Sequence, residues 1–93
     1  MNNVMRVLVE FLGEVRRLTG RSIAWIELPE EASLHTLFYK ISDLFGKDVY
    51  ESMVHKFFEK QLFVFVNGIS VGGLEHKLKN MDRVLFTTLA YGG

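Results

Sequence analysis

Residues 33–46 (SLHTLFYKISDLFG) are the stretch of this sequence that decides the fold. Ser33 is a good N-cap, because its hydroxyl can accept a hydrogen bond from a free amide of the first helical turn. Gly46 is placed to end the helix in the left-handed conformation. The stretch therefore predicts an amphipathic helix with one apolar face, made of Leu34, Leu37, Phe38, Ile41, Leu44 and Phe45.

Two alternating segments precede this helix and predict strands. In residues 4–12 (VMRVLVEFL) one face holds Met5, Val7, Val9 and Phe11, and the other holds Arg6, Leu8 and Glu10. Residues 22–28 alternate in the same way, with Ala24, Ile26 and Leu28 opposite Trp25 and Glu27. Residues 13–20 form a glycine-bounded connection with room for one helical turn. The two segments therefore predict a hairpin with a long loop.

A second helix and three further strands are predicted after residue 46. Asp48 and Glu51 resemble a capping box, and the helix at 48–60 carries an apolar stripe of Val49, Tyr50, Met53, Val54, Phe57 and Phe58. The apolar run 62–66 (LFVFV) predicts a buried strand, and Asn67-Gly68 is a strong signal for a hairpin turn into a short strand at 69–71. Residues 79–82 predict a turn before the last strand, at 83–90.

This order of elements predicts an α+β fold of the β-grasp (ubiquitin-like) type. In it a mixed sheet has the main helix across one face, the second helix lies in the connection to the third strand, and the first and last strands are parallel and central. We expect residues 1–90 to form a single domain. Residues 91–93 (Tyr-Gly-Gly) are expected to form a flexible C-terminal diglycine tail, since terminal segments without side chains to pack usually fray.

Composition excludes several classes of function. The 93 residues suffice for one domain, and 48% hydrophobic residues argue against disorder. Eleven basic and eleven acidic residues cancel, so no overall field attracts nucleic acid or an anionic membrane. The sequence has no cysteine, which excludes disulfides and a thiolate nucleophile. No apolar run reaches the roughly 20 residues that span a bilayer, and no export signal is visible, so we expect a cytoplasmic protein.

Other candidate sites in the sequence are weak. His35, His55 and His76 are far apart and lack the spacing of metal ligands, so no metal site is expected. The early arginines are interleaved with Glu10 and Glu14, which favours an ordinary surface over a nucleic-acid patch. A docking edge for an acidic partner is the alternative for these arginines, which are Arg6, Arg16, Arg17 and Arg21.

Several segments, in order along the chain, resemble the MoaD/ThiS family of ubiquitin-like sulfur carriers. They are the first strand, FLGEVRRLTG at 11–20, ELPEEASLHTL at 27–37, VFVNG at 64–68, the turn with Asp82 and Val84, and the closing Gly92-Gly93. The opening segment is more similar to the molybdopterin branch (the molybdopterin synthase small subunit) than to the shorter thiamin carriers. Thr87-Thr88-Leu89 stands where many molybdopterin-branch members have a proline pair.

The resemblance implies a function that is carried by the tail. A separate activating enzyme would use ATP to adenylate the carboxylate of Gly93, which then becomes a thiocarboxylate. The tail, with Tyr91 and Gly92, would enter the large subunit of molybdopterin synthase, because glycine lacks a Cβ and fits a narrow channel. The chain itself would be no enzyme and would bind no cofactor. The alternatives are a thiamin-type carrier, a protein modifier joined through Gly93 to lysines of its targets, and an interaction module with an incidental tail.

A partner must also recognise the folded domain, because a short tail buries too little surface for stable docking. We expect the docking surface on the sheet face away from the main helix. Its anchors would be Leu8 and Leu85, with Leu89 near the tail and Arg6 at the rim. The competing interpretation is that the helix at 48–60 covers this face. Phe57 and Phe58 are expected in the core, and the sequence leaves open whether their helix covers the core or binds a partner.

Overall fold

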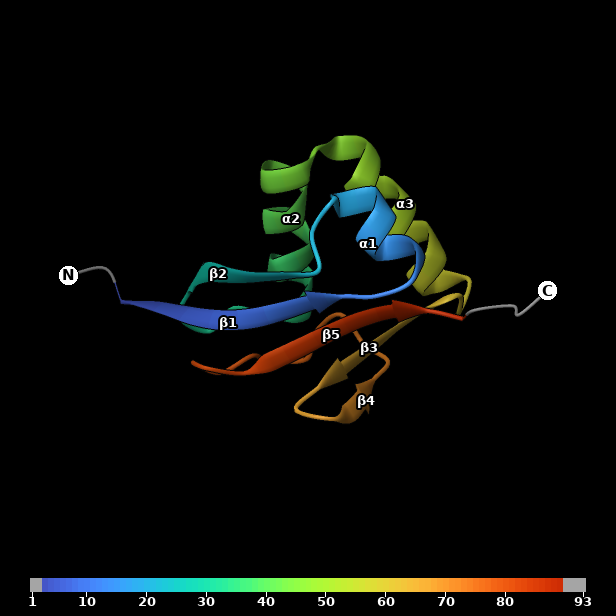
Figure 1. Cartoon of the computed structure of the whole chain (residues 1–93). Coiled ribbons are helices and arrows are strands. Elements are labelled where there is room, and N and C mark those ends of the chain that lie inside the picture. The colour runs from blue at the N-terminus through green and yellow to red at the C-terminus, as the bar shows by residue number, and fades with distance from the viewer. Residues whose placement is uncertain (1–2, 90–93) are drawn as a thin grey trace.

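The computed structural model describes residues 3–89, so Tyr91, Gly92 and Gly93 lie outside the described residues. Within these residues five strands and two helices follow one another in the predicted order, and a third, short helix, α1, lies in the connection between the first two strands (Figure 1). Their bounds are β1 Val4–Phe11, α1 Glu14–Thr19, β2 Ile23–Pro29, α2 Leu34–Phe45, α3 Lys47–Phe58, β3 Leu62–Val66, β4 Ile69–Val71 and β5 Arg83–Thr88.

The strands form one mixed sheet in the order β2-β1-β5-β3-β4. β1 and β5 are parallel, with Leu8 opposite Arg83, whereas β2, β3 and β4 pair with their neighbours in antiparallel fashion. Asn67 and Gly68 both have positive φ, as the tight turn between β3 and β4 requires. The sheet confirms the predicted β-grasp, with the first and last strands parallel in its middle.

The core lies between this sheet and the helices, which all sit on one side of it (Figure 1). The odd-numbered residues of β1, from Met5 to Phe11, are buried as the alternation predicts. Aromatic rings fill the centre: Phe86 stacks on Phe11 with ring centroids 6.1 Å apart and contacts Phe38 at 5.4 Å. The opposite face of the sheet is left without helices, and this placement creates the candidate site.

The capping of α2 agrees with the prediction at its start and differs at its end. The Ser33 hydroxyl accepts from the Thr36 amide at 3.3 Å, and the Thr36 hydroxyl accepts from the Ser33 amide at 3.1 Å. Gly46 has φ 105° and ψ 157°, a positive-φ conformation that glycine tolerates but that is not the left-handed helical one. α3 therefore begins directly at Lys47, with Gly46 as its N-cap and without the predicted capping box of Asp48 and Glu51.

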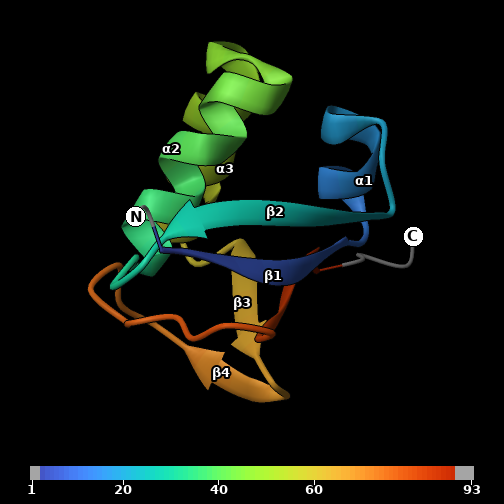
Figure 2. The ribbon, with the colours of Figure 1, turned by 90° about the vertical axis from the view of Figure 1, so that its left-hand side faces the viewer.

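α3 packs on α2, on the same side of the sheet (Figure 2). Met53 is fully buried, and Phe57 contacts Phe38 with ring centroids 5.7 Å apart. The prediction that Phe58 belongs to the core is wrong: 65% of it is exposed, because the last turn of α3 can direct only one of two adjacent phenylalanines toward α2. Leu44 is also exposed, because Phe45 takes the core position beside Phe11.

Two tyrosines, one from each helix, stack at the contact between α2 and α3. The rings of Tyr39 on α2 and Tyr50 on α3 stack with centroids 5.6 Å apart. Burial, together with the neighbouring Tyr39, raises the pKa of the Tyr50 hydroxyl above its usual value. The stacked rings of Tyr39 and Tyr50 add packing where the two helices meet.

Candidate functional site

The side of the sheet that faces away from the helices is called the open face below. Its residues are fixed by strand alternation and by the register of the pairs. Trp25 of β2 lies opposite Leu8 of β1. On β5, Leu85 lies opposite Glu10 on one side and Phe65 of β3 on the other. Residues from four strands therefore meet on one surface.

The centre of the open face is apolar and accessible. Leu8, Leu85 and Phe65 are half-buried, so each still presents part of its side chain to solvent. Trp25 is 50% exposed and Ile23 is 47% exposed, both on the edge strand β2. Exposed apolar side chains gathered on one face of a sheet often mark a binding site, although the registers here place Glu10 and Arg83 between Leu8 and Leu85.

Charged groups are held in place across this apolar surface. The Arg83 guanidinium donates to the Glu10 carboxylate at 2.9 Å, which links β5 to β1. The Arg6 guanidinium lies over the Trp25 ring, 4.7 Å from its centroid. Because guanidinium groups stacked or paired in this way lose less freedom on binding, they suit the rim of a docking surface.

The structure brings together three of the four predicted docking residues. Leu8, Leu85 and Arg6 lie on the open face, and α3 does not cover them, because it lies on the other side of the sheet. Leu89 is exposed but follows the end of β5, and it lines a separate hollow with Glu14, Lys56, Gln61 and Thr88. The prediction that Leu89 joins the patch of Leu8 is therefore not met by the structure.

Sequence reasoning missed several residues of this face. Trp25 and Ile23 were outside the predicted patch, although the alternation in 22–28 places Trp25 away from the core side. Phe63 and Phe65 were read as part of a buried run, but they alternate with Leu62, Val64 and Val66 and are only half-buried. Alternation within LFVFV could have shown that Phe63 and Phe65 share one face of the strand. It was not recognised because both faces of this strand carry apolar residues.

The end of β5 is fixed by its contact with the start of α1. The Glu14 amide donates to the Thr88 hydroxyl at 2.9 Å. Gly13 has φ 65°, and a Cβ at this position would clash with the same hydroxyl. Lys56 of α3 pairs with Glu14 at 3.4 Å, so all three elements meet beside the last described residues. The end of β5 is thus tied to α1 by direct contacts.

Within residues 3–89 no group of three His, Asp or Glu side chains comes together as metal ligands would. None of the helices that the structure describes is both long and apolar enough to cross a membrane.

Comparisons with known proteins find the same fold in small ubiquitin-like proteins. A provisionally named molybdopterin converting factor, subunit 1, of Pyrococcus furiosus superposes with a TM-score of 0.72 and 25% identity, over 92% of this chain and 99% of that one. The small archaeal modifier protein 1 of Haloferax volcanii gives 0.74 at 11% identity, over 92% and 99% of the two chains. Urm1 of Trypanosoma brucei gives 0.72 at 20% identity over all of both chains.

These likenesses confirm the predicted β-grasp and the predicted resemblance to the MoaD/ThiS family, since one neighbour is named as a molybdopterin converting factor subunit. The matches below 25% identity establish the fold alone. No family model matches the sequence, and no curated protein sequence matches it either.

Proposed function

We propose that this chain is a ubiquitin-like sulfur carrier, with Gly93 as its working end, that supplies sulfur for molybdopterin (molybdenum cofactor) biosynthesis. The observation that carries the proposal is the open face. Its apolar centre includes Leu85 on β5, the strand that leads in sequence to Gly92-Gly93. A partner that binds this face would have the tail within its reach. The likeness to the Pyrococcus furiosus protein supports the molybdopterin branch.

The chemistry needs only a reachable carboxylate from this chain. A carboxylate oxygen of Gly93 attacks the α-phosphorus of ATP, and pyrophosphate leaves. Sulfide then attacks the carbonyl carbon of the acyl adenylate, and AMP leaves with the oxygen. The product is a C-terminal thiocarboxylate. Because Gly92 and Gly93 have no side chains, nothing on the tail obstructs the attack or the walls of a narrow channel.

Catalysis in this proposal belongs to the partners. An activating enzyme binds the open face, uses its own ATP site and releases the charged carrier. The large subunit of molybdopterin synthase then receives the tail and takes the sulfur. Leu8 and Leu85 act as apolar anchors for these partners, and Arg6 and Trp25 lie at the rim.

A second candidate function is favoured by one observation. The fold is shared with the small archaeal modifier protein 1. A modifier would use the same activated Gly93, but a lysine amine of a target protein would displace AMP and form an isopeptide bond. The two functions differ in the nucleophile alone, so the products distinguish them.

The test is a reaction followed by intact-protein mass spectrometry. We expect the chain ending at Gly93, incubated with a cognate activating enzyme, ATP and sulfide, to gain the mass of one oxygen-to-sulfur exchange at its C-terminus. Deletion of Gly93, or addition of one residue after it, should abolish the gain and leave the thermal midpoint unchanged. A gain that survives either change would place the chemistry elsewhere. A ladder of lysine conjugates in cells, with no thiocarboxylate, would support the modifier instead.

A further inference from the structure

Asn67 and Gly68 form the turn between β3 and β4, and they are the one asparagine–glycine pair in the sequence. Such a pair is chemically labile, because no side chain shields the main-chain nitrogen of the glycine when it attacks the carboxamide of the asparagine before it. Ammonia is lost, and the asparagine becomes aspartate or isoaspartate. The rate in the folded chain therefore depends on how the Asn67 carboxamide is held.

Two hydrogen bonds hold the carboxamide of Asn67 in the folded chain. Its Nδ2 donates to Asp82 Oδ1 at 2.8 Å, and its Oδ1 accepts from the Arg83 amide at 2.9 Å. The main-chain amide of Asn67 also donates to the Arg83 carbonyl, at 2.8 Å. The side chain must break both carboxamide bonds before it can turn toward the nitrogen of Gly68.

Asp82 is itself fixed in position. Only 8% of it is exposed, and its second oxygen, Oδ2, accepts from the Lys79 amide at 2.7 Å. Hydrogen bonds to an ionised acceptor are stronger than those between neutral groups. The restraint on Asn67 therefore depends on the Asp82 carboxylate.

Burial does not protect this turn. Asn67 and Gly68 are both exposed, and they line a hollow of about 560 Å³ on the open face together with Phe65 and Leu85. A Cβ added at Gly68 would meet open space. Water and room for a ring are thus available, so the hydrogen bonds alone keep the reacting atoms apart.

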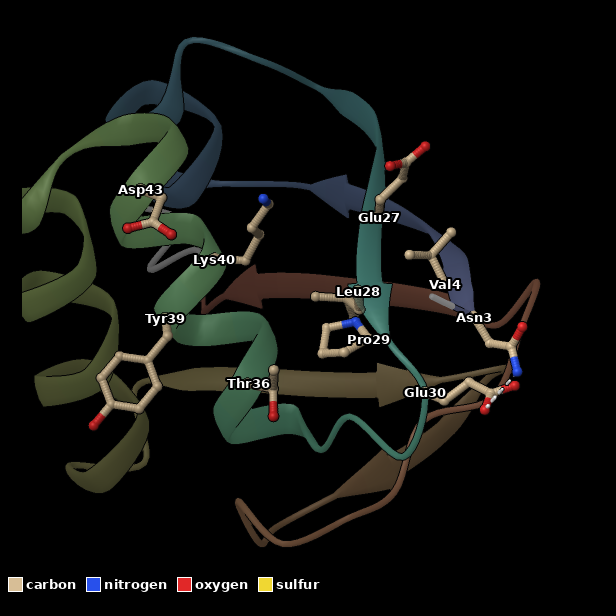
Figure 3. A pocket seen from close by; sticks show the side chains of 10 residues that line it. All are labelled: Asn3, Val4, Glu27, Leu28, Pro29, Glu30, Thr36, Tyr39, Lys40 and Asp43. Carbon is tan, nitrogen blue, oxygen red and sulfur yellow. Dashed lines mark hydrogen bonds between the residues drawn. The ribbon is translucent and has the colours of Figure 1, made fainter. Parts of the chain in front are cut away.

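The other asparagines that the structure describes differ in the residue that follows them. Asn3 donates one long hydrogen bond to Glu30, at 3.4 Å, beside the hollow between β2 and α2 (Figure 3). It precedes Val4, and Asn80 precedes Met81. The side chains of valine and methionine hinder attack by their main-chain nitrogens, so both asparagines serve as internal references.

We propose that Asn67 is a site of spontaneous deamidation, that the reaction requires opening of the turn between β3 and β4, and that Asp82 controls this opening. In the open turn the Gly68 nitrogen bonds to Cγ of Asn67. The proton of that nitrogen leaves with the carboxamide nitrogen as ammonia, and a succinimide ring remains. Water then adds to one of the two ring carbonyls and breaks its bond to nitrogen, which yields aspartate or isoaspartate.

Either product removes the donor that faces Asp82. Aspartate sets a second carboxylate against it, and like charges in contact repel. Isoaspartate also adds a methylene group to the main chain within the turn, where Val66 pairs with Ile69. Deamidation therefore loosens the connection between β3, β4 and the start of β5.

The rate is measured by peptide mapping with mass spectrometry after incubation of the whole chain at mildly alkaline pH. We expect Asn67 to convert about tenfold faster or more in the chain unfolded in urea than in the folded chain. Asp82→Ala should raise the rate in the folded chain by about tenfold or more, because it frees Nδ2 of Asn67. Asn3 and Asn80 should convert slowly in every sample.

Val15→Ala is the matched control for the loss of Asp82. It removes buried volume from α1, which meets the opposite end of β5, and leaves the turn intact. It should lower the thermal midpoint but raise the conversion rate by less than about twofold, since the turn opens locally.

A second comparison tests the product. Asn67→Asp should lower the thermal midpoint by about 5 °C or more. Asn80→Asp should change it little, because an aspartate can still accept the hydrogen bond that Asn80 accepts from the Arg6 amide. The proposal is overturned if Asn67 converts equally fast in the folded and unfolded chains, if Val15→Ala accelerates conversion as much as Asp82→Ala, or if Asn67→Asp keeps the midpoint of the parent.

Discussion

Leu85 lies in the middle of the open face, between Glu10 on β1 and Phe65 on β3. A charge at this position would enter the desolvated centre of any complex formed there. We expect Leu85→Asp to lower the rate of adenylation by the activating enzyme about 30-fold or more, as loss of a hot spot does. The free energy of unfolding should fall by only about 1 kcal/mol, because the side chain is half-buried and the new carboxylate lies near Glu10.

The matched control for this substitution is Leu44→Asp. Leu44 is 51% exposed on α2, far from the open face, and its replacement should leave both the adenylation rate and the thermal midpoint nearly unchanged. A collapse of the midpoint in Leu85→Asp would show that Leu85 is core. An unchanged adenylation rate would place the docking surface elsewhere.

Gly13 and Gly68 make a second comparison at the residue scale. Both have positive φ, but a Cβ would meet Thr88 at Gly13 and open space at Gly68. Gly68→Ala should cost about 1–2 kcal/mol of unfolding free energy from backbone strain alone. Gly13→Ala should cost about 2–4 kcal/mol, since overpacking adds to the strain. Urea unfolding measures both.

The double variant tests the assigned cause. In a Thr88→Ala background the hydroxyl is gone, so adding Gly13→Ala should cost about as much as Gly68→Ala does. An undiminished cost for Gly13→Ala in that background would contradict the clash.

At the scale of elements, α3 is held by one of its two adjacent phenylalanines. Phe57 packs against Phe38, whereas Phe58 is mostly exposed. Phe57→Ala should lower the free energy of unfolding by about 2–3 kcal/mol. Phe58→Ala should lower it by less than about 1 kcal/mol, the worth of its edge contact with Phe57. Equal losses in thermal unfolding would mean that both rings belong to the core.

Elements governed by local patterns could be predicted from the sequence. The alternation of 4–12, the helical stripe of 33–46 and the Asn67-Gly68 turn all have a short-range physical cause, and the structure confirms them. The conformation of Gly46 could not be predicted, because it depends on α3 starting at once and packing back on α2. The exposure of Leu44 and Phe58 could not be predicted either. An apolar stripe shows which residues share one face of a helix, but it does not show how much of that face the neighbouring elements cover.

The candidate site was predictable in part for the same reason. Leu8 and Arg6 share a face by alternation alone, and parallel pairing of the first and last strands adds Leu85. Placing Trp25 beside Leu8 required the register of β2 against β1, and a long connecting loop does not determine that register. The location of Leu89 depends on where β5 ends. That end is set by tertiary contacts, such as the hydrogen bond between the Glu14 amide and the Thr88 hydroxyl, which the sequence pattern does not show.

At the scale of the whole molecule, the helices all lie on one side of the sheet and leave the open face uncovered. The residues of the core and the residues of the open face therefore alternate along the same strands, as they do in β1.

The parallel pairing of β1 with β5 also determines when this protein can fold during its synthesis. β1 leaves the ribosome first, but its central partner begins at Arg83, so Leu8 must wait for almost the whole chain. A nascent chain that stops before β5 keeps the second edge of β1 bare and its core side without Val84 and Phe86, which exposes it to proteases. We therefore expect chains that stop before Arg83 to be cleaved by a protease faster than the 93-residue chain.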